Sequence, residues 1–233
     1  MSVEQIIPAG TVHDGRSATQ ALLPDDAAPS WQSRCVNALL RLLPLKKQTA
    51  SAAAVQEHVR RLELRPASHA PTGLGRGVTV TLKNVAGWPV YYTAPTANPE
   101  GGNVVLFLHG GGYVNEIVRA HWRIVGTMTR EAGVRCVVPI YPLAPRGTAI
   151  DVVPATGELL RKLLEEAGAA KVTVVGNSAG AGLALAAAQW LRNCGHRQSN
   201  GLVLISPGVN LSVDRPEQVA IAARDPINDI PGT

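Results

Sequence analysis

Four short, unbroken apolar runs constrain the fold of this chain more than any other feature. They read NVVLFLHG, VRCVVPIY, KVTVVGN and GLVLISP, at residues 103–110, 134–141, 171–177 and 201–207. Strands that are apolar on both faces are typical of a parallel sheet that helices cover on each side. The runs therefore predict the core of an α/β fold.

Helical segments separate these runs, and we expect them at about 117–132, 152–167 and 179–193. Upstream, GVTVTLKNV and WPVYYTAP alternate around the Ala86-Gly87 turn, which predicts an antiparallel hairpin. Strand and helix alternation behind a hairpin predicts a mixed, mostly parallel sheet with right-handed crossovers.

The first 70 residues follow a different pattern. Residues 1–29 predict a loose arm, and Ser30 is placed to cap a helix whose apolar stripe begins at Trp31. A second helix is expected at about 51–64. We predict two parts, residues 1–70 as arm and cap helices and 71–233 as the core domain. The helix pair packs onto the core, forms a lid, or does both.

Composition excludes several function classes. The chain has 233 residues and a net charge of +5, but its basic residues are scattered. The densest group, around Arg60 and Arg61, is interleaved with Glu57 and Glu63 and predicts a solvated helix face rather than a nucleic-acid site. The three cysteines form no CxxC pair and no metal-ligand spacing, so we expect free thiols and no metal.

The N-terminal residues lack the basic start and apolar stretch of a signal peptide. No run approaches the roughly 18 apolar residues of a membrane span. We therefore expect a cytoplasmic protein without a membrane span.

The segment KVTVVGNSAGAGLALAAA, residues 171–188, permits two interpretations. Residues 176–180 fit G-x-S-x-G, the elbow that presents a catalytic serine, but the glycines also fit a loop that binds a dinucleotide pyrophosphate. The dinucleotide loop requires an acidic residue about 20 positions later, and residues 196–206 contain none. The serine elbow is therefore favoured.

A nucleophilic serine also needs backbone N–H groups directed at the charge that develops on the attacked carbonyl. The glycine-rich segment FLHGGGY, residues 107–113, follows an earlier strand and meets this requirement. The elbow and the glycine loop, in this order along the chain, predict acyl transfer through Ser178.

These motifs resemble those of the hormone-sensitive-lipase-like branch of the α/β-hydrolases, also called α/β-hydrolase fold-3. The resemblance runs from about residue 31 to the end of the chain. The family's HGGG, GDSAG, YRLAPE and SPxxxLS segments correspond to His109–Gly112, Gly176–Gly180, Tyr141–Arg146 and Ser206–Ser212. Asn177 in place of Asp and Arg146 in place of Glu depart from the pattern, which leaves open any bonds made through those carboxylates.

The resemblance implies an α/β-hydrolase fold with an N-terminal helical cap segment. It also implies that Ser178 is the nucleophile and that the N–H groups of Gly111, Gly112 and Ala179 form the oxyanion hole. The implied activity is a carboxylesterase or lipase-like hydrolysis of short or medium acyl esters or lactones, without a cofactor.

A serine nucleophile needs a base to take its proton and an acid to orient that base, in the chain order Ser, Asp or Glu, His. The only later histidine, His196, follows the helix after the elbow and is expected roughly 20 Å from Ser178. His109 is expected to fix the glycine loop. Neither is predicted to be the base.

The later carboxylates do not supply the acid either. Asp225-Pro226 resembles the family's segment leading toward the substrate-side loop, and Asp214 and Asp229 have no motif support. We expect the triad acid and base, with the family's last strands and helices, to be absent from this C-terminally truncated chain. The prediction is little or no turnover. The alternatives are a non-catalytic binding module and a fragment of an interrupted gene.

The run at 201–207 is then expected to expose an apolar strand. Each buried aliphatic side chain contributes roughly 1.5–3 kcal/mol, so partial exposure lowers the free energy of unfolding by several kcal/mol. An exposed apolar edge also favours pairing with another chain. The sequence predicts a poorly stable protein that self-associates through this strand.

Overall fold

The computed structural model describes residues 29–42, 47, 50–65, 67–168, 171–208 and 225. The chain divides into two compact units, Met1–Ala52 with Pro216–Thr233, and Ala53–Arg215. Helix α2 (Trp31–Leu42) belongs to the first unit, and the sheet with its helices belongs to the second. The boundary predicted at residue 70 stays a prediction.

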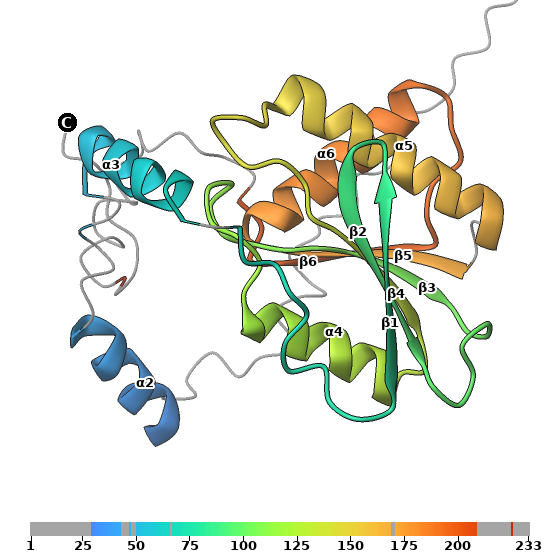
Figure 1. Cartoon of the computed structure of the whole chain (residues 1–233), viewed down its shortest axis with the longest axis horizontal. Coiled ribbons are helices and arrows are strands. Elements are labelled where there is room, and N and C mark those ends of the chain that lie inside the picture. The colour runs from blue at the N-terminus through green and yellow to red at the C-terminus, as the bar shows by residue number, and fades with distance from the viewer. Residues whose placement is uncertain are drawn as a thin grey trace, which may run out of the picture. The chain divides into compact units, whose positions relative to one another are not determined.

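The described residues of the second unit form a six-stranded sheet in the order β1-β2-β4-β3-β5-β6 (Figure 1). The first two strands form the predicted antiparallel hairpin, and β2 also pairs antiparallel with β4. Strands β4, β3, β5 and β6 are mutually parallel, which confirms the predicted mostly parallel α/β sheet. The strands are β1 (Val78–Val85), β2 (Trp88–Pro95), β3 (Val104–Leu108), β4 (Arg135–Pro139), β5 (Val172–Asn177) and β6 (Gly201–Ile205).

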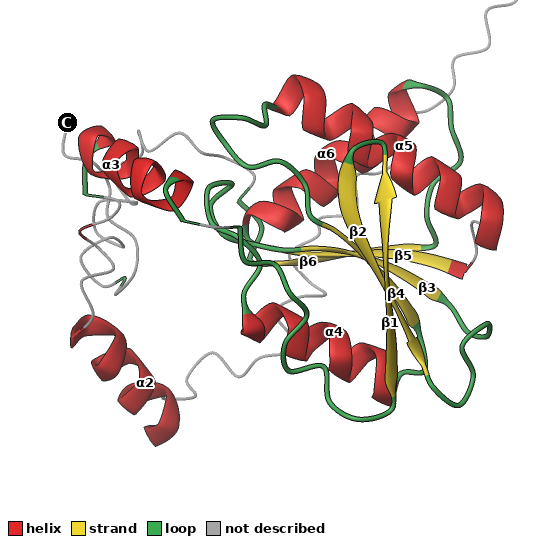
Figure 2. Ribbon diagram, in the orientation of Figure 1, coloured by secondary structure: helices red, strands yellow, loops and turns green. Residues whose placement is uncertain are grey.

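Helices cover both faces of this sheet (Figure 2). Helix α4 (Arg119–Glu131) lies on one face, and α5 (Ala149–Ala167) and α6 (Ala179–Asn193) lie on the other. The central strand β3 is buried along its whole length, with Leu106 in the core under α5 and α6 and Phe107 in the core under α4. This alternation explains why its sequence is apolar without interruption.

Helix α5 begins at Ala149, three residues before the predicted start. Pro154 lies in the second turn of this helix, where its ring removes one helical N–H donor. Thr148 precedes the helix, donates its hydroxyl to Asp151 Oδ2 at 2.6 Å, and accepts the N–H of Val152 with its carbonyl. The carbonyl of Ile150 loses its partner at Pro154, but Ile150 is exposed and water can hydrate it.

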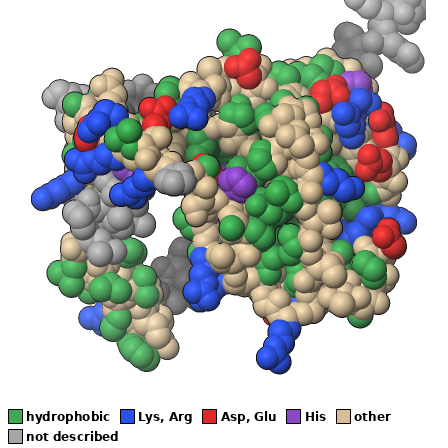
Figure 3. All heavy atoms as spheres, in the orientation of Figure 1, with side chains coloured by type: hydrophobic (Ala, Val, Ile, Leu, Met, Phe, Trp, Pro, Cys, Tyr) green, Lys and Arg blue, Asp and Glu red, His purple; other side chains and the backbone are tan. Residues whose placement is uncertain are grey.

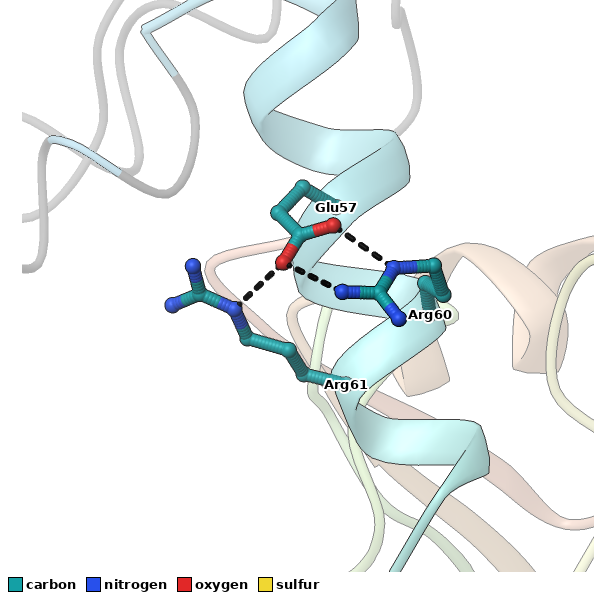
Figure 4. A network of polar contacts seen from close by, with 3 residues as sticks. All are labelled: Glu57, Arg60 and Arg61. Atoms are coloured by element: carbon teal, nitrogen blue, oxygen red, sulfur yellow. Dashed lines mark hydrogen bonds and ion pairs between the residues drawn. The ribbon is translucent and has the colours of Figure 1, made fainter.

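Helix α3 (Ala52–Glu63) carries the basic cluster noted in the sequence. Figure 4 shows that Glu57 accepts hydrogen bonds from both Arg60 and Arg61, which lie three and four residues later on the same helix. These bonds lower the pKa of the Glu57 carboxyl to about 2. The contacts confirm a solvated, internally paired helix face.

Strand β6 pairs with β5 on one side and, among the described residues, with no strand on the other. Its side chains Leu202, Val203 and Ile205 remain 36%, 46% and 45% exposed. The predicted apolar exposure of this strand is therefore present. None of the described helices combines the length and the apolar character needed to cross a membrane.

Candidate active site

The turn between β5 and α6 places Ser178 at the carboxyl edge of the sheet. Ser178 has φ 51° and ψ −120°, a left-handed backbone conformation that few L-residues adopt. Its N–H donates to the carbonyl of Ile205 at 2.8 Å, which ties the turn to the end of β6. The side chain is exposed at the start of α6. The predicted elbow is thus a tight turn that presents a hydroxyl to solvent.

The small residues of the elbow permit close packing against β3. A Cβ atom at Gly180 would collide with the backbone carbonyls of Leu108 and His109. Only glycine allows the first turn of α6 to lie this close to the end of the neighbouring strand. The position therefore holds Ser178 beside the loop that follows β3.

That loop begins at His109 and contains the three consecutive glycines. Because β3 and β5 are neighbouring parallel strands, with Leu108 paired to Gly176, their carboxyl ends meet at one edge. A Cβ atom built at Gly110 would lie 3.2 Å from Cβ of Ser178. The structure thus brings together the two motifs that the sequence separates by about 65 residues.

Asn177 joins the two motifs directly. Its Oδ1 accepts the N–H of Gly110 at 2.9 Å, across the gap between β5 and β3. An amide oxygen accepts this bond as a carboxylate oxygen does. The departure from Asp at this position therefore leaves at least this one acceptor function in place.

Three further N–H groups lie at the same edge. Among the described residues, the N–H groups of Gly111 and Gly112 donate no backbone hydrogen bond. The N–H of Ala179 is the first of α6, and the first four N–H groups of a helix have no partner within it. These donors, at the positive end of the α6 dipole, can stabilise an anion beside Ser178.

Hydrogen bonds from Asn115 hold the glycine loop in place. Gly111 has φ 136°, and its carbonyl accepts both the N–H and the Nδ2 of Asn115, at 2.9 and 3.0 Å. A Cβ atom at Gly111 would lie 2.5 Å from the Asn115 carbonyl oxygen, so only glycine fits here. Sequence reasoning missed Asn115, for which the only signal is its position four residues after Gly111.

Asn115 also links the loop to α3. The Nε2 of His58 donates to Asn115 Oδ1 at 2.8 Å, since the amide oxygen can only accept. The bond spans 57 residues of sequence, and no motif marks His58, so this contact could not be predicted from local pattern. Through it, α3 contacts the backbone that carries Gly111.

A second contact joins α3 to the loop after β4. Arg146 Nε lies 3.6 Å from Glu63 Oε1, and both side chains are largely exposed. At this position the family pattern has Glu, which would face Glu63 with like charge. The departure at Arg146 is therefore matched by an acidic partner on α3.

His109 is fully buried behind the loop. Its Nδ1 donates to the carbonyl of Gly110 at 2.8 Å, its ring stacks on Tyr141 at 4.5 Å, and the Tyr141 hydroxyl donates to its carbonyl at 2.6 Å. Burial lowers the pKa of the imidazole to about 4, so the ring is neutral near pH 7. These contacts support the loop-fixing role expected from the sequence.

No hydrogen bond joins the Ser178 hydroxyl to a side chain among the described residues. His196 follows the far end of α6, which is about 22 Å long, and its ring lies near Trp190. Of the three later aspartates, Asp214 and Asp229 lie outside the described residues, and Asp225 belongs to the other unit.

Two cavities, of about 410 and 260 Å³, lie away from Ser178. The larger lies by the hairpin and the amino ends of β3 and β4, and the smaller lies between the hairpin turn and α5. Neither is lined by the elbow or the glycine loop. The described residues also contain no cluster of three His, Cys, Asp or Glu side chains that could hold a metal.

Comparison with known proteins identifies a family and several relatives of this chain. Residues 105–230 match a family model described as an α/β hydrolase fold. A triacylglycerol lipase of Mycobacterium tuberculosis is 36% identical over 155 residues, which cover 65% of this chain and 35% of the lipase. An acetyl-hydrolase of Streptomyces hygroscopicus is 31% identical over 131 residues, covering 56% and 44%. The chain thus spans about a third to a half of the length of these relatives.

Solved structures show the same architecture. The hormone-sensitive-lipase homologue EstE7, from a metagenome library, superposes with a TM-score of 0.65 at 27% identity and covers 84% of this chain and 64% of its own. An esterase/lipase from an uncultured bacterium gives a TM-score of 0.68 at 22% identity, covering 85% and 66%. The second likeness concerns the fold alone.

Proposed function

Because the chain belongs to the α/β-hydrolase fold family, in its hormone-sensitive-lipase-like branch, we propose that it carries the nucleophile and oxyanion hole of a serine carboxylic-ester hydrolase. The proposed substrates are short or medium acyl esters or lactones, and no cofactor takes part. A cytoplasmic location stays a prediction.

One observation supports this proposal above all others. Ser178 is exposed on a strained turn whose backbone lies against Gly110, while the N–H groups of Gly111 and Gly112 donate no backbone bond among the described residues. Strain of this kind is typical of functional sites, where the surrounding structure maintains it. A purely structural serine requires neither the strain nor the adjacent donors.

The proposed reaction begins with attack of Ser178 Oγ on the acyl carbon of the ester. The carbonyl oxygen becomes an oxyanion, which the N–H groups of Gly111, Gly112 and Ala179 stabilise. Collapse of this intermediate breaks the bond to the alcohol and leaves an acyl group on Ser178. Attack by water then releases the carboxylic acid and restores the hydroxyl.

Both steps require a base, and we propose that this chain alone turns over slowly for that reason. Four of the five described histidines have other hydrogen-bond partners: His58 binds Asn115, His69 binds Tyr91, His109 binds Gly110 and His121 binds Val118. The fifth, His196, follows the far end of α6, away from Ser178. Without a triad base and acid, an oxyanion hole and substrate binding still leave roughly 10³–10⁴-fold catalysis over water.

Among the described residues the Ser178 hydroxyl has no side-chain partner, which also favours a second candidate, a non-catalytic module that binds acyl compounds at the same edge. The two candidates differ in whether Ser178 reacts. Self-association through β6 is a further proposal, supported by the apolar side chains exposed on that strand.

Hydrolysis of p-nitrophenyl acetate by the full chain tests the enzyme proposal. We expect a slow rate above buffer that Ser178→Ala removes and that Ser68→Ala, a change at an exposed loop serine, leaves intact. Turnover near the median of about 10 s⁻¹ for enzymes would contradict the low-turnover proposal. A rate that survives Ser178→Ala would contradict the assignment of the nucleophile.

Binding of phenylboronic acid separates the two candidates. Boron accepts a serine Oγ and then presents a tetrahedral anion to the oxyanion donors. Calorimetric binding that Ser178→Ala abolishes supports a reactive serine with a formed oxyanion hole. Binding that Ser178→Ala leaves unchanged supports the non-catalytic module.

A further inference from the structure

Helix α2 has an apolar face that no described residue buries. The side chains of Trp31, Leu39 and Leu42 are 70%, 61% and 81% exposed, and the helix contains no buried residue. At 3.6 residues per turn these three fall on one side of the helix, together with Cys35. Figure 3 shows hydrophobic side chains gathered over α2, at the lower left.

The opposite side of α2 is polar and basic. Ser33, Asn37, Arg34 and Arg41 fall within an arc of about 100°, with the two arginines seven residues apart and therefore two turns apart on the same side of the helix. Ser30 caps the helix, accepting the N–H of Ser33 with its Oγ at 3.2 Å, as the sequence predicts. The helix is thus well defined at its start and amphipathic along its length.

The stretch of sequence from residue 27 to residue 56, which includes α2, is cationic. Between Asp26 and Glu57 the chain has two arginines and two lysines and no acidic residue. Helix α3 differs in this respect, because Glu57 pairs with Arg60 and Arg61 (Figure 4). Its apolar residues Val55, Val59 and Leu62 are also less exposed than those of α2.

We propose that α2 is an interfacial helix that lies on an anionic lipid surface. An apolar face with Trp and Leu beside a polar face that carries arginine is typical of helices that lie in the headgroup region. With 12 residues, or about 18 Å, α2 is too short to cross the bilayer and long enough to lie along it.

Charge complementarity selects this occupant over a second copy of the chain. The whole protein carries +5, so another copy would bring further positive charge to a segment that is already cationic. The cytoplasmic leaflet carries anionic lipids, and each Lys or Arg near its surface strengthens attachment by about fivefold. The proposal does not depend on the proposed ester hydrolysis.

Vesicle co-flotation of the full chain tests whether α2 binds an anionic lipid surface. The vesicles consist of phosphatidylcholine alone or of phosphatidylcholine mixed with phosphatidylglycerol. We expect binding to the mixed vesicles and little binding to the neutral ones. Arg34→Gln with Lys47→Gln should lower the partition coefficient by roughly 25-fold. Arg192→Gln with Arg197→Gln removes the same charge from exposed positions in the last turn of α6 and just after it, and should leave partitioning within about twofold.

The apolar face is tested by Leu39→Ala with Leu42→Ala, which keeps helix propensity and removes apolar area. The partition coefficient should fall at least about tenfold, with an unchanged thermal transition of the core. Brominated lipid should quench the fluorescence of Trp31, and Trp31→Phe should lose that quenching. Absence of binding to anionic vesicles, or equal loss in the Arg192 and Arg197 control, overturns the proposal.

Discussion

Ser178 is the residue whose backbone conformation is least compatible with its side chain. A non-glycine residue at φ 51° and ψ −120° costs of order 1–3 kcal/mol, which the rest of the structure must offset. We expect Ser178→Gly to raise the free energy of unfolding by about 1 kcal/mol relative to Ser178→Ala. Urea denaturation of the two variants measures this difference.

Both substitutions remove the hydroxyl, so the comparison isolates the backbone. The same exchange at Ser68, an exposed loop position without positive φ, serves as the control. There, glycine should be no more stable than alanine, because it gains entropy in the unfolded chain. Equal stability of the two Ser178 variants would show that the elbow is unstrained.

His109 makes stability depend on pH. Burial lowers the pKa of its imidazole from 6.5 to about 4, so between these values the unfolded chain binds a proton that the folded chain does not. Its contribution is fully present above pH 6.5 and is lost as the pH falls toward 4, by about 3 kcal/mol in total. Burial lowers the pKa of His121 in the same direction.

Urea denaturation at several pH values between 7 and 4 tests this. Carboxyl groups also titrate in this range, so the informative quantity is the difference between the wild type and His109→Gln. That difference should be constant above pH 6.5 and shrink below it. A difference that stays constant down to pH 4 would mean that His109 protonates in the folded state.

At this scale, the sequence predicted what local motifs encode. The serine elbow and the glycine loop each occupy five to seven consecutive residues, and they lie together as expected. The contacts of His58 and Asn115 were not predictable, because they join positions 57 residues apart that belong to no shared motif. The hydrogen bond that Asn177 accepts could be predicted only by knowing that the N–H of Gly110 faces its side chain.

At the scale of elements, α5 and α6 pack closely where Gly157 faces Trp190. A Cβ atom at Gly157 on α5 would collide with the indole ring of Trp190 on α6. Overpacking of this kind costs typically 1–3 kcal/mol, which exceeds the helix propensity that alanine gains over glycine. We expect Gly157→Ala to be destabilising by about 1–2 kcal/mol in thermal or urea denaturation.

Trp190→Leu supplies the control for this pair. In the Trp190→Leu variant the indole ring is absent, so adding Gly157→Ala should leave the free energy of unfolding unchanged or raise it. A double-mutant cycle with no coupling between the two positions would show that the helices separate freely at this point.

The elements themselves were largely predictable, because each strand of the parallel core is apolar on both faces and each helix ends near a glycine. The start of α5 was not. The turn at Thr148 begins the helix, and the exposure of Ile150 permits Pro154 in the second turn. Such compensation depends on solvent exposure, which the local sequence does not report.

At the scale of the whole molecule, both edge strands of the described sheet expose apolar side chains. On β6 these include Val203 and Ile205, and on β1 they include Val80 and Leu82. We expect association through β6, so Val203→Lys with Ile205→Lys should shift the protein toward monomer in sedimentation velocity.

The same pair of changes on β1, Val80→Lys with Leu82→Lys, adds equal charge at the other edge. It should leave the association unchanged. A wild-type protein that sediments as a monomer at all concentrations and unfolds in a sharp, reversible thermal transition would contradict both the association and the low stability expected of the chain.

The position of β3 between β4 and β5 also sets an order of events during synthesis. The glycine loop after β3 leaves the ribosome first, but its neighbour across the site, Asn177, follows roughly 65 residues later. At about 5–20 residues per second this interval lasts roughly 3–13 s. During this interval the N–H of Gly110 cannot donate to Asn177, which has not yet been synthesised. The two halves of the candidate site therefore join only after the chain has been translated through β5.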